Sequence, residues 1–203
     1  MEFTKRKIGI CEIQLHHSSA LAPQADWLLS YLEKMHREGY VFFSGMKIQF
    51  GWSFLELHEI GRDAYVIREP DFSGNPFEEF RQDVSVTLQI QAMQNSLIAK
   101  LGVLPTVVSF QDKIIIAKGC LGAEQIYMER IPPQPDKADS GWFVGFLNGD
   151  NQQSNLQSIY VYQLLSRPIL LQFLLLPAGS LIVLKGDHVE AILDVEGKSL
   201  MAP

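Results

Sequence analysis

The stretch that decides the fold class reads Ile48-Gln-Phe-Gly-Trp-Ser-Phe-Leu-Glu-Leu-His-Glu-Ile-Gly-Arg-Asp-Ala-Tyr-Val-Ile67. From Ile48 to Leu57 the apolar residues are mostly two positions apart, which is the period of a β-strand. Gly61-Arg62-Asp63 is typical of a turn, and a second short apolar run follows at Tyr65 to Ile67. The stretch therefore predicts a β-hairpin.

Segments with helical spacing lie on both sides of this hairpin. An apolar stripe over residues 22–38 predicts one helix, with Pro23 in its first turn and Gly39 after its end. A longer helix is predicted from Phe77 to Leu101, with Asn75 as its N-cap and Pro76 at its first position. The residues of the first stripe are Trp27, Leu28, Tyr31, Leu32 and Met35.

Short apolar runs predict further strands before and after these helices. A first strand is expected at residues 7–15, with Ile8 and Ile10 as apolar positions. In the second half, strands are expected at 113–118, 125–129, 142–146, 181–184 and 189–193, and a helix pair at 160–165 and 168–175. The strand at 125–129 is expected to be the hairpin partner of the strand at 113–118. Strands and helices interleave without a regular βαβ alternation, which favours an α+β fold with mostly antiparallel sheets. We expect two small units, residues 1–105 and 106–203.

Composition narrows the classes of partner. The chain has 203 residues, is 47% hydrophobic and carries a formal net charge of -6. Nucleic acid is not expected as a partner, because phosphate contacts need clustered cations. The most apolar window, residues 159–176, holds Arg167-Pro168 at its centre, which is unsuited to a membrane span. No signal peptide is visible, so a cytoplasmic protein without a membrane partner is expected.

The residues that could carry chemistry form no recognisable catalytic or metal motif. Cys11 and Cys120 are expected to be reduced and buried. The adjacent His16 and His17 would point to opposite faces of a strand and could not share a metal, and both are expected on the surface or in a loop. We therefore expect no catalytic residue, no cofactor, no metal and no enzyme activity. His58 with Glu56 leaves one alternative open, a small hydrolase or transferase, and a general protein-binding adaptor is another.

Acidic residues concentrate in one window. Residues 56–83 contain eight acids and three arginines, so this window holds -5 of the total charge. One interpretation is a solvated face with acids in the first turns of the long helix, and the other is a docking surface for a basic partner. The candidate partner-binding residues are Glu56, Glu59, Asp63, Glu69, Asp71, Phe72, Phe77, Glu78 and Glu79.

A stretch in the second half is similar to a known family. Asp139-Ser-Gly-Trp142, followed by Phe143 and by Gly149-Asp150, resembles the immunity-protein-33-like family, also called domain of unknown function 2185. The stretch from Pro168 to Gly179 fits the closing part of that pattern, and the resemblance covers roughly residues 112 to 190. After Gly149 the family often continues with several acids, whereas this chain reads Asp150-Asn-Gln-Gln-Ser-Asn155.

The resemblance implies a function. Such proteins are encoded beside bacterial toxins, and they are thought to protect the producing cell by binding the toxin stoichiometrically. It implies a cognate toxin or effector as the partner, and by analogy with nuclease toxins a basic one. Asp139 and Ser140 suit a turn, and Trp142 suits the core, so this motif is expected to be structural.

Overall fold

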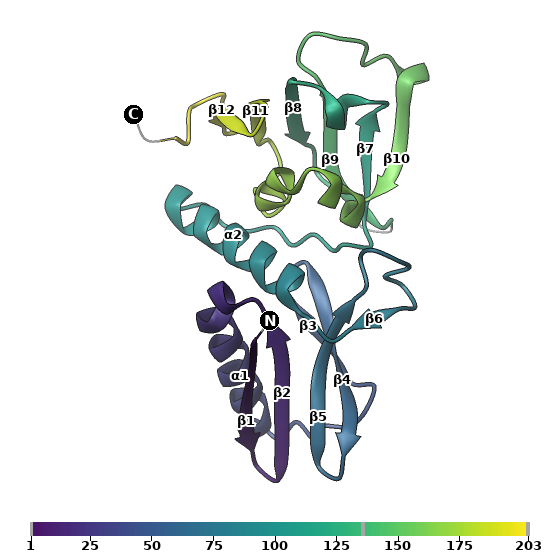
Figure 1. Cartoon of the computed structure of the whole chain (residues 1–203). Helices are drawn as coiled ribbons and strands as arrows, with labels where there is room; N and C mark the ends of the chain where they lie inside the picture. Colours follow the sequence, from purple (N-terminus) through teal and green to yellow (C-terminus); the bar gives the residue numbers. More distant parts are fainter. Residues whose placement is uncertain (1, 135–136, 202–203) are drawn as a thin grey trace. The chain divides into compact units, whose positions relative to one another are not determined.

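The chain folds into two compact units, residues 1–92 and 93–203. The computed structural model describes residues 2–134 and 137–201 (Figure 1). The division falls inside helix α2 (Ser85–Leu101). Each unit contains one six-stranded sheet, in which a single strand pair is parallel and the other pairs among the described residues are antiparallel. The α+β class with mostly antiparallel sheets is thereby confirmed.

The sheet of the first unit is built from one hairpin, an antiparallel meander of three strands and a short added strand. Its order is β1 (Glu2–Ile8), β2 (Cys11–His17), β5 (Ala64–Pro70), β4 (Ser53–Gly61) and β3 (Lys47–Phe50), and β6 (Phe80–Arg81) pairs with the end of β5. Strands β2 and β5 form the parallel pair. The predicted hairpin around residues 61–63 is β4 and β5, with Asp63 at a positive φ of 56° in the turn.

Two runs that sequence spacing predicted as single strands are hairpins. The expected strand at residues 7–15 turns at Gly9-Ile10, and the run from Ile48 to Leu57 turns at Gly51-Trp52. Both glycines have a positive φ, 61° at Gly9 and 58° at Gly51, which a two-residue hairpin turn requires and a strand does not allow. Ile10 is consequently 75% exposed rather than a core residue.

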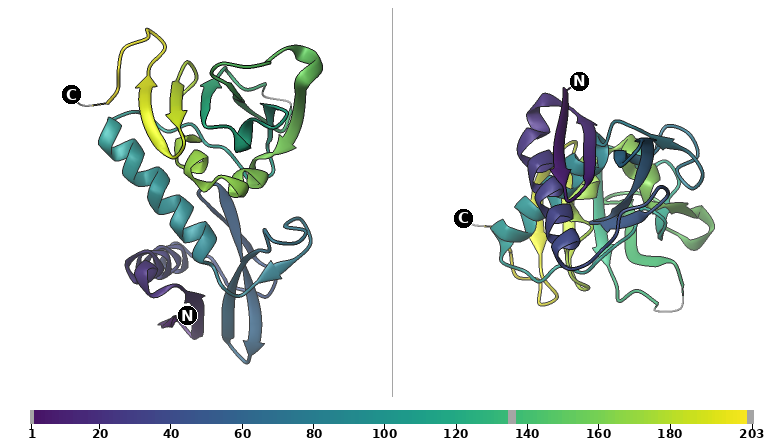
Figure 2. Two further views of the ribbon diagram at one scale, coloured as in Figure 1. Left: turned by 45° about the horizontal axis from the view of Figure 1, so that its top comes forward. Right: turned by 90° about the horizontal axis from the view of Figure 1, so that it is seen from below.

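One face of this sheet is covered by α1 (Ala22–Arg37), which lies along β1 and β2 (Figures 1 and 2). Leu28, Leu29 and Leu32 are fully buried in the shared core. Trp27 does not belong to the buried stripe, because it is 54% exposed and stacks on Tyr31, with ring centroids 5.9 Å apart. The helix is therefore amphipathic as expected, with a narrower buried face.

The predicted helix over residues 77–101 begins later, at Ser85. Polar side chains hold the preceding segment in turns: the Asn75 side-chain oxygen, Oδ1, accepts the Phe77 N–H, and the Glu79 carboxylate accepts the Asn75 N–H at 3.0 Å. Residues 80–81 then pair with β5 instead of joining the helix. Glu78, Glu79 and Asp83 therefore do not lie in the first turn of a long helix.

The sheet of the second unit has the order β10 (Leu156–Tyr160), β7 (Lys113–Ala117), β9 (Asp139–Phe146), β8 (Gln125–Arg130), β11 (Leu181–Lys185) and β12 (His188–Leu193). The expectation that residues 125–129 pair with 113–118 is wrong, because β7 pairs with β10 and β9. Directly opposed residues on five strands form a buried row: Ile116, Val144, Met128, Ile182 and Ile192.

The predicted helix pair of the second unit is present as two 3₁₀-helices, η4 (Val161–Ser166) and η5 (Pro168–Phe173). They lie near one end of the strands (Figures 1 and 2). Their apolar side chains are buried, and the chain just beyond them accepts hydrogen bonds from Arg130 and Trp142, which lie on the buried face of the sheet. Cys11 and Cys120 are both buried and unpaired.

Candidate functional site

The acidic residues predicted as a partner surface lie at two ends of the first sheet. Glu59 and Asp63 are exposed at the turn between β4 and β5. Asp71, Phe72, Phe77, Glu78 and Glu79 lie in the loop after β5. Because β5 spans seven residues, the two groups are separated by about 20 Å of strand (~3.3 Å per residue). The structure therefore does not bring these residues together on one surface.

Several of the predicted residues are engaged within the fold. Glu56 forms an ion pair with Arg68 on the neighbouring strand. Asp71 accepts the N–H of Ser73 at 3.0 Å and its hydroxyl at 2.6 Å, which lowers the pKa of Asp71. Phe72 stacks on the buried Trp52 at 5.0 Å between ring centroids. Glu78 is exposed, and Phe77 has 36% of its surface exposed.

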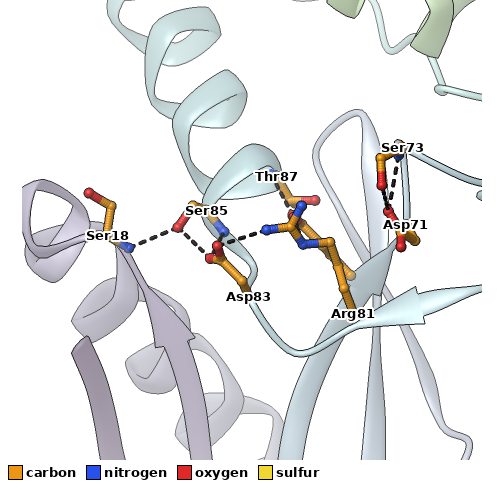
Figure 3. A network of polar contacts seen from close by, with 8 residues as sticks. Ser18, Asp71, Ser73, Arg81, Asp83, Ser85 and Thr87 are labelled. Atoms are coloured by element: carbon orange, nitrogen blue, oxygen red, sulfur yellow. Dashed lines mark hydrogen bonds and ion pairs between the residues drawn. The ribbon is translucent and has the colours of Figure 1, made fainter. Parts of the chain in front are cut away.

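Glu69 belongs to a polar network at the start of α2. Figure 3 labels its partners in this network, Arg81, Asp83, Ser85 and Thr87. The Glu69 side chain is fully buried and accepts the Thr87 N–H at 2.7 Å. Arg81 lies 3.7 Å from the Glu69 carboxylate and donates to Asp83 at 2.8 Å. Burial raises the pKa of Glu69 to about 7, because the Thr87 and Arg81 contacts compensate only part of the lost hydration.

The same network caps α2. Asp83 accepts the N–H of Ser85 at 3.0 Å and its hydroxyl at 2.5 Å, and the hydroxyl oxygen of Ser85 accepts the Ser18 N–H at 2.8 Å. Burial opposes ionisation of Asp83, but the hydrogen bonds from Ser85 and the charge of Arg81 give it a lowered pKa. Negative charge at this position also suits the positive end of the helix. Glu69 and Asp83 thus serve the local structure of the first unit.

The candidate acid–base pair lies on one face of β4, since Glu56 and His58 are two residues apart. Glu56 is committed to Arg68, and His58 is half-buried. His17, expected on the surface, is fully buried with its Nε2 2.8 Å from the Thr4 hydroxyl. Across residues 2–134 and 137–201, no three His, Cys, Asp or Glu side chains cluster in a way that could hold a metal ion. The same residues contain no helix long and apolar enough to cross a bilayer.

In the second unit, the segment Asp139-Ser-Gly-Trp142 forms a hydrogen-bonded bend at the start of β9. Asp139 accepts the N–H groups of Gly141 and Gln134, and the Ser140 hydroxyl donates to the Lys113 carbonyl at 2.7 Å. Gly141 has a φ of 72°, and a Cβ there would lie 2.2 Å from the Ile131 carbonyl oxygen. Trp142 is buried and donates its Nε1–H to the Leu174 carbonyl at 3.0 Å. These contacts make the motif a structural element.

Arg130 lies beside Trp142 and is also buried, with 1% of its surface exposed. Its guanidinium donates to four backbone carbonyls: those of Ser140, Thr106, Leu174 and Leu176. Burial lowers the pKa of Arg130 to about 10, although Asp112 and Asp139 oppose that shift. The Arg130 side chain therefore connects β8 to β9 and to the segment that follows η5 through hydrogen bonds.

The opposite face of this sheet is largely apolar and partly accessible. One cross-strand row on it reads Ser158, Ile115, Phe143, Glu129, Leu181 and Leu193, and the next row contains Gly145, Tyr127, Val183 and Ala191. Ile115 is 37% exposed, and the apolar members beyond it are half-buried. Tyr127 and Phe143 are in ring contact at 5.6 Å. We call these two rows the open face.

A cavity of about 700 Å³ adjoins the open face where it meets the segment after β8. Ile115, Phe143 and Glu129 line it from the sheet, and Ile131 and Lys137 line it from the segment before β9. Among the other lining residues, Lys113 places its Nζ 3.2 Å from the centre of the Tyr160 ring, and Asp139 is bonded to backbone N–H groups. The size is within the range of about 300–1,000 Å³ typical of binding pockets.

Sequence reasoning did not find the open face. The signal was present in β7, where Ile114, Ile115 and Ile116 follow one another and must point alternately to both faces. An antiparallel sheet with one solvated face normally alternates between apolar and polar residues, so consecutive apolar residues indicate that neither face is polar.

A family model for the Imm33-like domain matches residues 93–195, which include the whole sheet of the second unit. No curated protein matches the chain, and no solved structure does. The matched segment comprises the bend at Asp139–Trp142, the buried Arg130 and the open face. Since this match covers just over half of the chain, the protein belongs to the Imm33-like family.

Proposed function

We propose that this protein is an immunity protein that neutralises a cognate bacterial toxin by stoichiometric binding in the cytoplasm of the producing cell. The observation that carries the proposal is the Imm33-like match over residues 93–195. Inhibition by binding needs a complementary surface and no reacting groups, so the protein is proposed to act without turnover. The toxin activity can be of any kind, a nuclease included, because binding alone can block it.

The charge of the chain supports a basic partner. The net charge is -6, and Glu59, Asp63, Glu78 and Glu79 are exposed at the two ends of β5. We propose that these four carboxylates, with the exposed Phe77, attract a basic toxin during encounter. Complementary charge raises association rates more than it lowers dissociation rates. Glu56 and Glu69 are assigned no contact role, since they are engaged inside the fold.

The test begins with the genes beside this one: a toxin gene found there is co-expressed with this protein. Wild-type protein should restore growth, and the purified pair should form a complex with a fixed stoichiometry. Failure of the wild-type protein to bind and protect would refute the proposal. So would turnover of a substrate by the purified protein that is lost when His58→Ala is combined with Glu56→Gln.

A second measurement tests the proposed steering. Replacement of Glu59, Asp63, Glu78 and Glu79 by Lys should slow association about tenfold or more at low salt, with little change in dissociation. The matched control replaces Glu124 and Glu190, which are exposed acids of the second unit, and should change the rate much less. Equal association rates for wild type and the fourfold variant would show that these acids are only a solvated surface.

A further inference from the structure

The open face of the second unit contains one charged side chain, that of Glu129, within its two rows of strand residues. Its neighbours across the strands are Phe143 and Leu181, and Tyr127 and Ile131 stand two residues away along the chain. Glu129 is exposed and makes no ion pair or hydrogen bond with another described side chain. Its charge instead raises the pKa of the adjacent Tyr127, adding to the effect of burial.

This arrangement resembles the centre of a protein interface. Protein surfaces rarely keep aromatic and aliphatic side chains adjacent over several strands unless another molecule covers them. Interface energy is concentrated in a few apolar or aromatic anchors that enter pockets, and the cavity lined by Ile115, Ile131 and Phe143 is such a pocket. A carboxylate among these groups loses hydration when the face is covered, so the covering molecule must supply a cation.

We propose that the open face binds a segment of the toxin in which a large apolar side chain enters the cavity and an adjacent lysine or arginine pairs with Glu129. This inference rests on the proposed function and adds the location and chemistry of the contact. The occupant is assigned by charge complementarity: Glu129 forms no ion pair with a described residue, and the partner is expected to be basic. Lys137 also lines the cavity, but no ion pair joins it to Glu129. Lys113 does not compete, because its ammonium lies over the Tyr160 ring.

Three variants test the site. Ile115→Glu places a charge in the lining of the cavity, and Glu129→Lys reverses the one carboxylate of the open face. The matched control is Ile10→Glu in the first unit, where the isoleucine is 75% exposed in a turn. All three positions are exposed, and circular dichroism and thermal melting verify that each variant is folded. We expect Ile115→Glu and Glu129→Lys each to weaken toxin binding about thirtyfold or more, as hot-spot substitutions do, and Ile10→Glu to leave it unchanged.

A second probe keeps the site testable without the toxin. Short peptides displayed on phage are selected on the immobilised wild-type protein. Enriched peptides should pair an aromatic or aliphatic residue with Lys or Arg and lose binding to Ile115→Glu. Changing that Lys or Arg to Glu should restore binding to Glu129→Lys. Such peptides, together with no protection from the neighbouring toxin, would support the site and refute the proposed function.

Other outcomes refute the site. Toxin binding that is unaffected by Ile115→Glu and Glu129→Lys would place the contact elsewhere. Peptides that bind the wild type and Ile115→Glu equally, or no enrichment at all, would show that the open face does not take such a segment. A wild-type dimer in sedimentation that becomes monomeric in Ile115→Glu would assign the face to a second copy of the chain.

Discussion

Replacing Glu69 with glutamine should change how the stability of the first unit depends on pH. In the folded chain the Glu69 carboxyl is fully buried, accepts the Thr87 N–H and has a pKa of about 7. In the unfolded chain it has the ordinary value of about 4.5. A glutamine amide has nearly the same shape and can still accept the Thr87 N–H, but it does not titrate.

The sign of the effect follows from proton binding. Between pH 4.5 and 7 the folded state holds more protons at Glu69 than the unfolded state does, so stability falls as pH rises through this window. Below pH 4.5 both states are protonated and the effect is absent, whereas above pH 7 it is complete. The difference of about 2.5 pKa units corresponds to about 3 kcal/mol at 1.36 kcal/mol per unit. Asp71 and Asp83 act in a different window, because their lowered pKa values stabilise the folded state above about pH 4, and this stabilisation is lost as pH falls below it.

The assay is urea unfolding of the wild type and of Glu69→Gln at several pH values from 4.5 to 8, with tryptophan fluorescence as the signal. The difference between the two proteins removes the contribution of groups that titrate in both, histidines included. It should change by about 3 kcal/mol in favour of the variant as pH rises. A constant offset, which would reflect the lost Arg81 contact, does not affect this slope. Parallel pH profiles would refute the reasoning, as would a carboxyl pKa below 5 for Glu69 by carbon NMR.

Two further substitutions test the second unit. Arg130→Lys should lower the free energy of unfolding by about 3 kcal/mol, because one lysine ammonium cannot reach all four carbonyls. Each hydrogen bond to a charged group contributes about 1.5–3 kcal/mol. An unchanged melting temperature would contradict this expectation. Gly141→Ala should lower the free energy of unfolding by at least about 2 kcal/mol in denaturant titrations, because the added Cβ would meet the Ile131 carbonyl oxygen. The control is Gly119→Ala, at φ 83° with open space around it, which should lower that free energy by about 1 kcal/mol. Equal losses at the two glycines would show that backbone conformation alone, and not the close approach to Ile131, requires glycine at position 141.

Local patterns predicted the elements better than their pairing. The sequence predicts the turn at residues 61–63 and the helix with Pro23 in its first turn, because the signals for each lie within a few residues of one another. The turns at Gly9 and Gly51 were missed because each glycine is followed by a large apolar residue that continues the strand period. The sequence places the start of α2 too early because Asn75-Pro76 has the composition of a helix start. In the structure the Asn75 side chain closes a turn, and α2 begins at Ser85.

The candidate site was harder to predict for a reason of topology. Ile115, Glu129, Phe143 and Leu181 occupy one row, yet they come from four strands whose spatial order differs from their order in the sequence. By contrast, the acidic residues of the window 56–83 are close together in the sequence, but strand β5 places them at opposite ends of the sheet. Alternation shows that two faces exist, but only the pairing register shows which residues meet on each. A lone carboxylate in an apolar row is therefore visible only once the sheet is assembled, and this feature makes Glu129 the sharpest point at which to test the proposed contact.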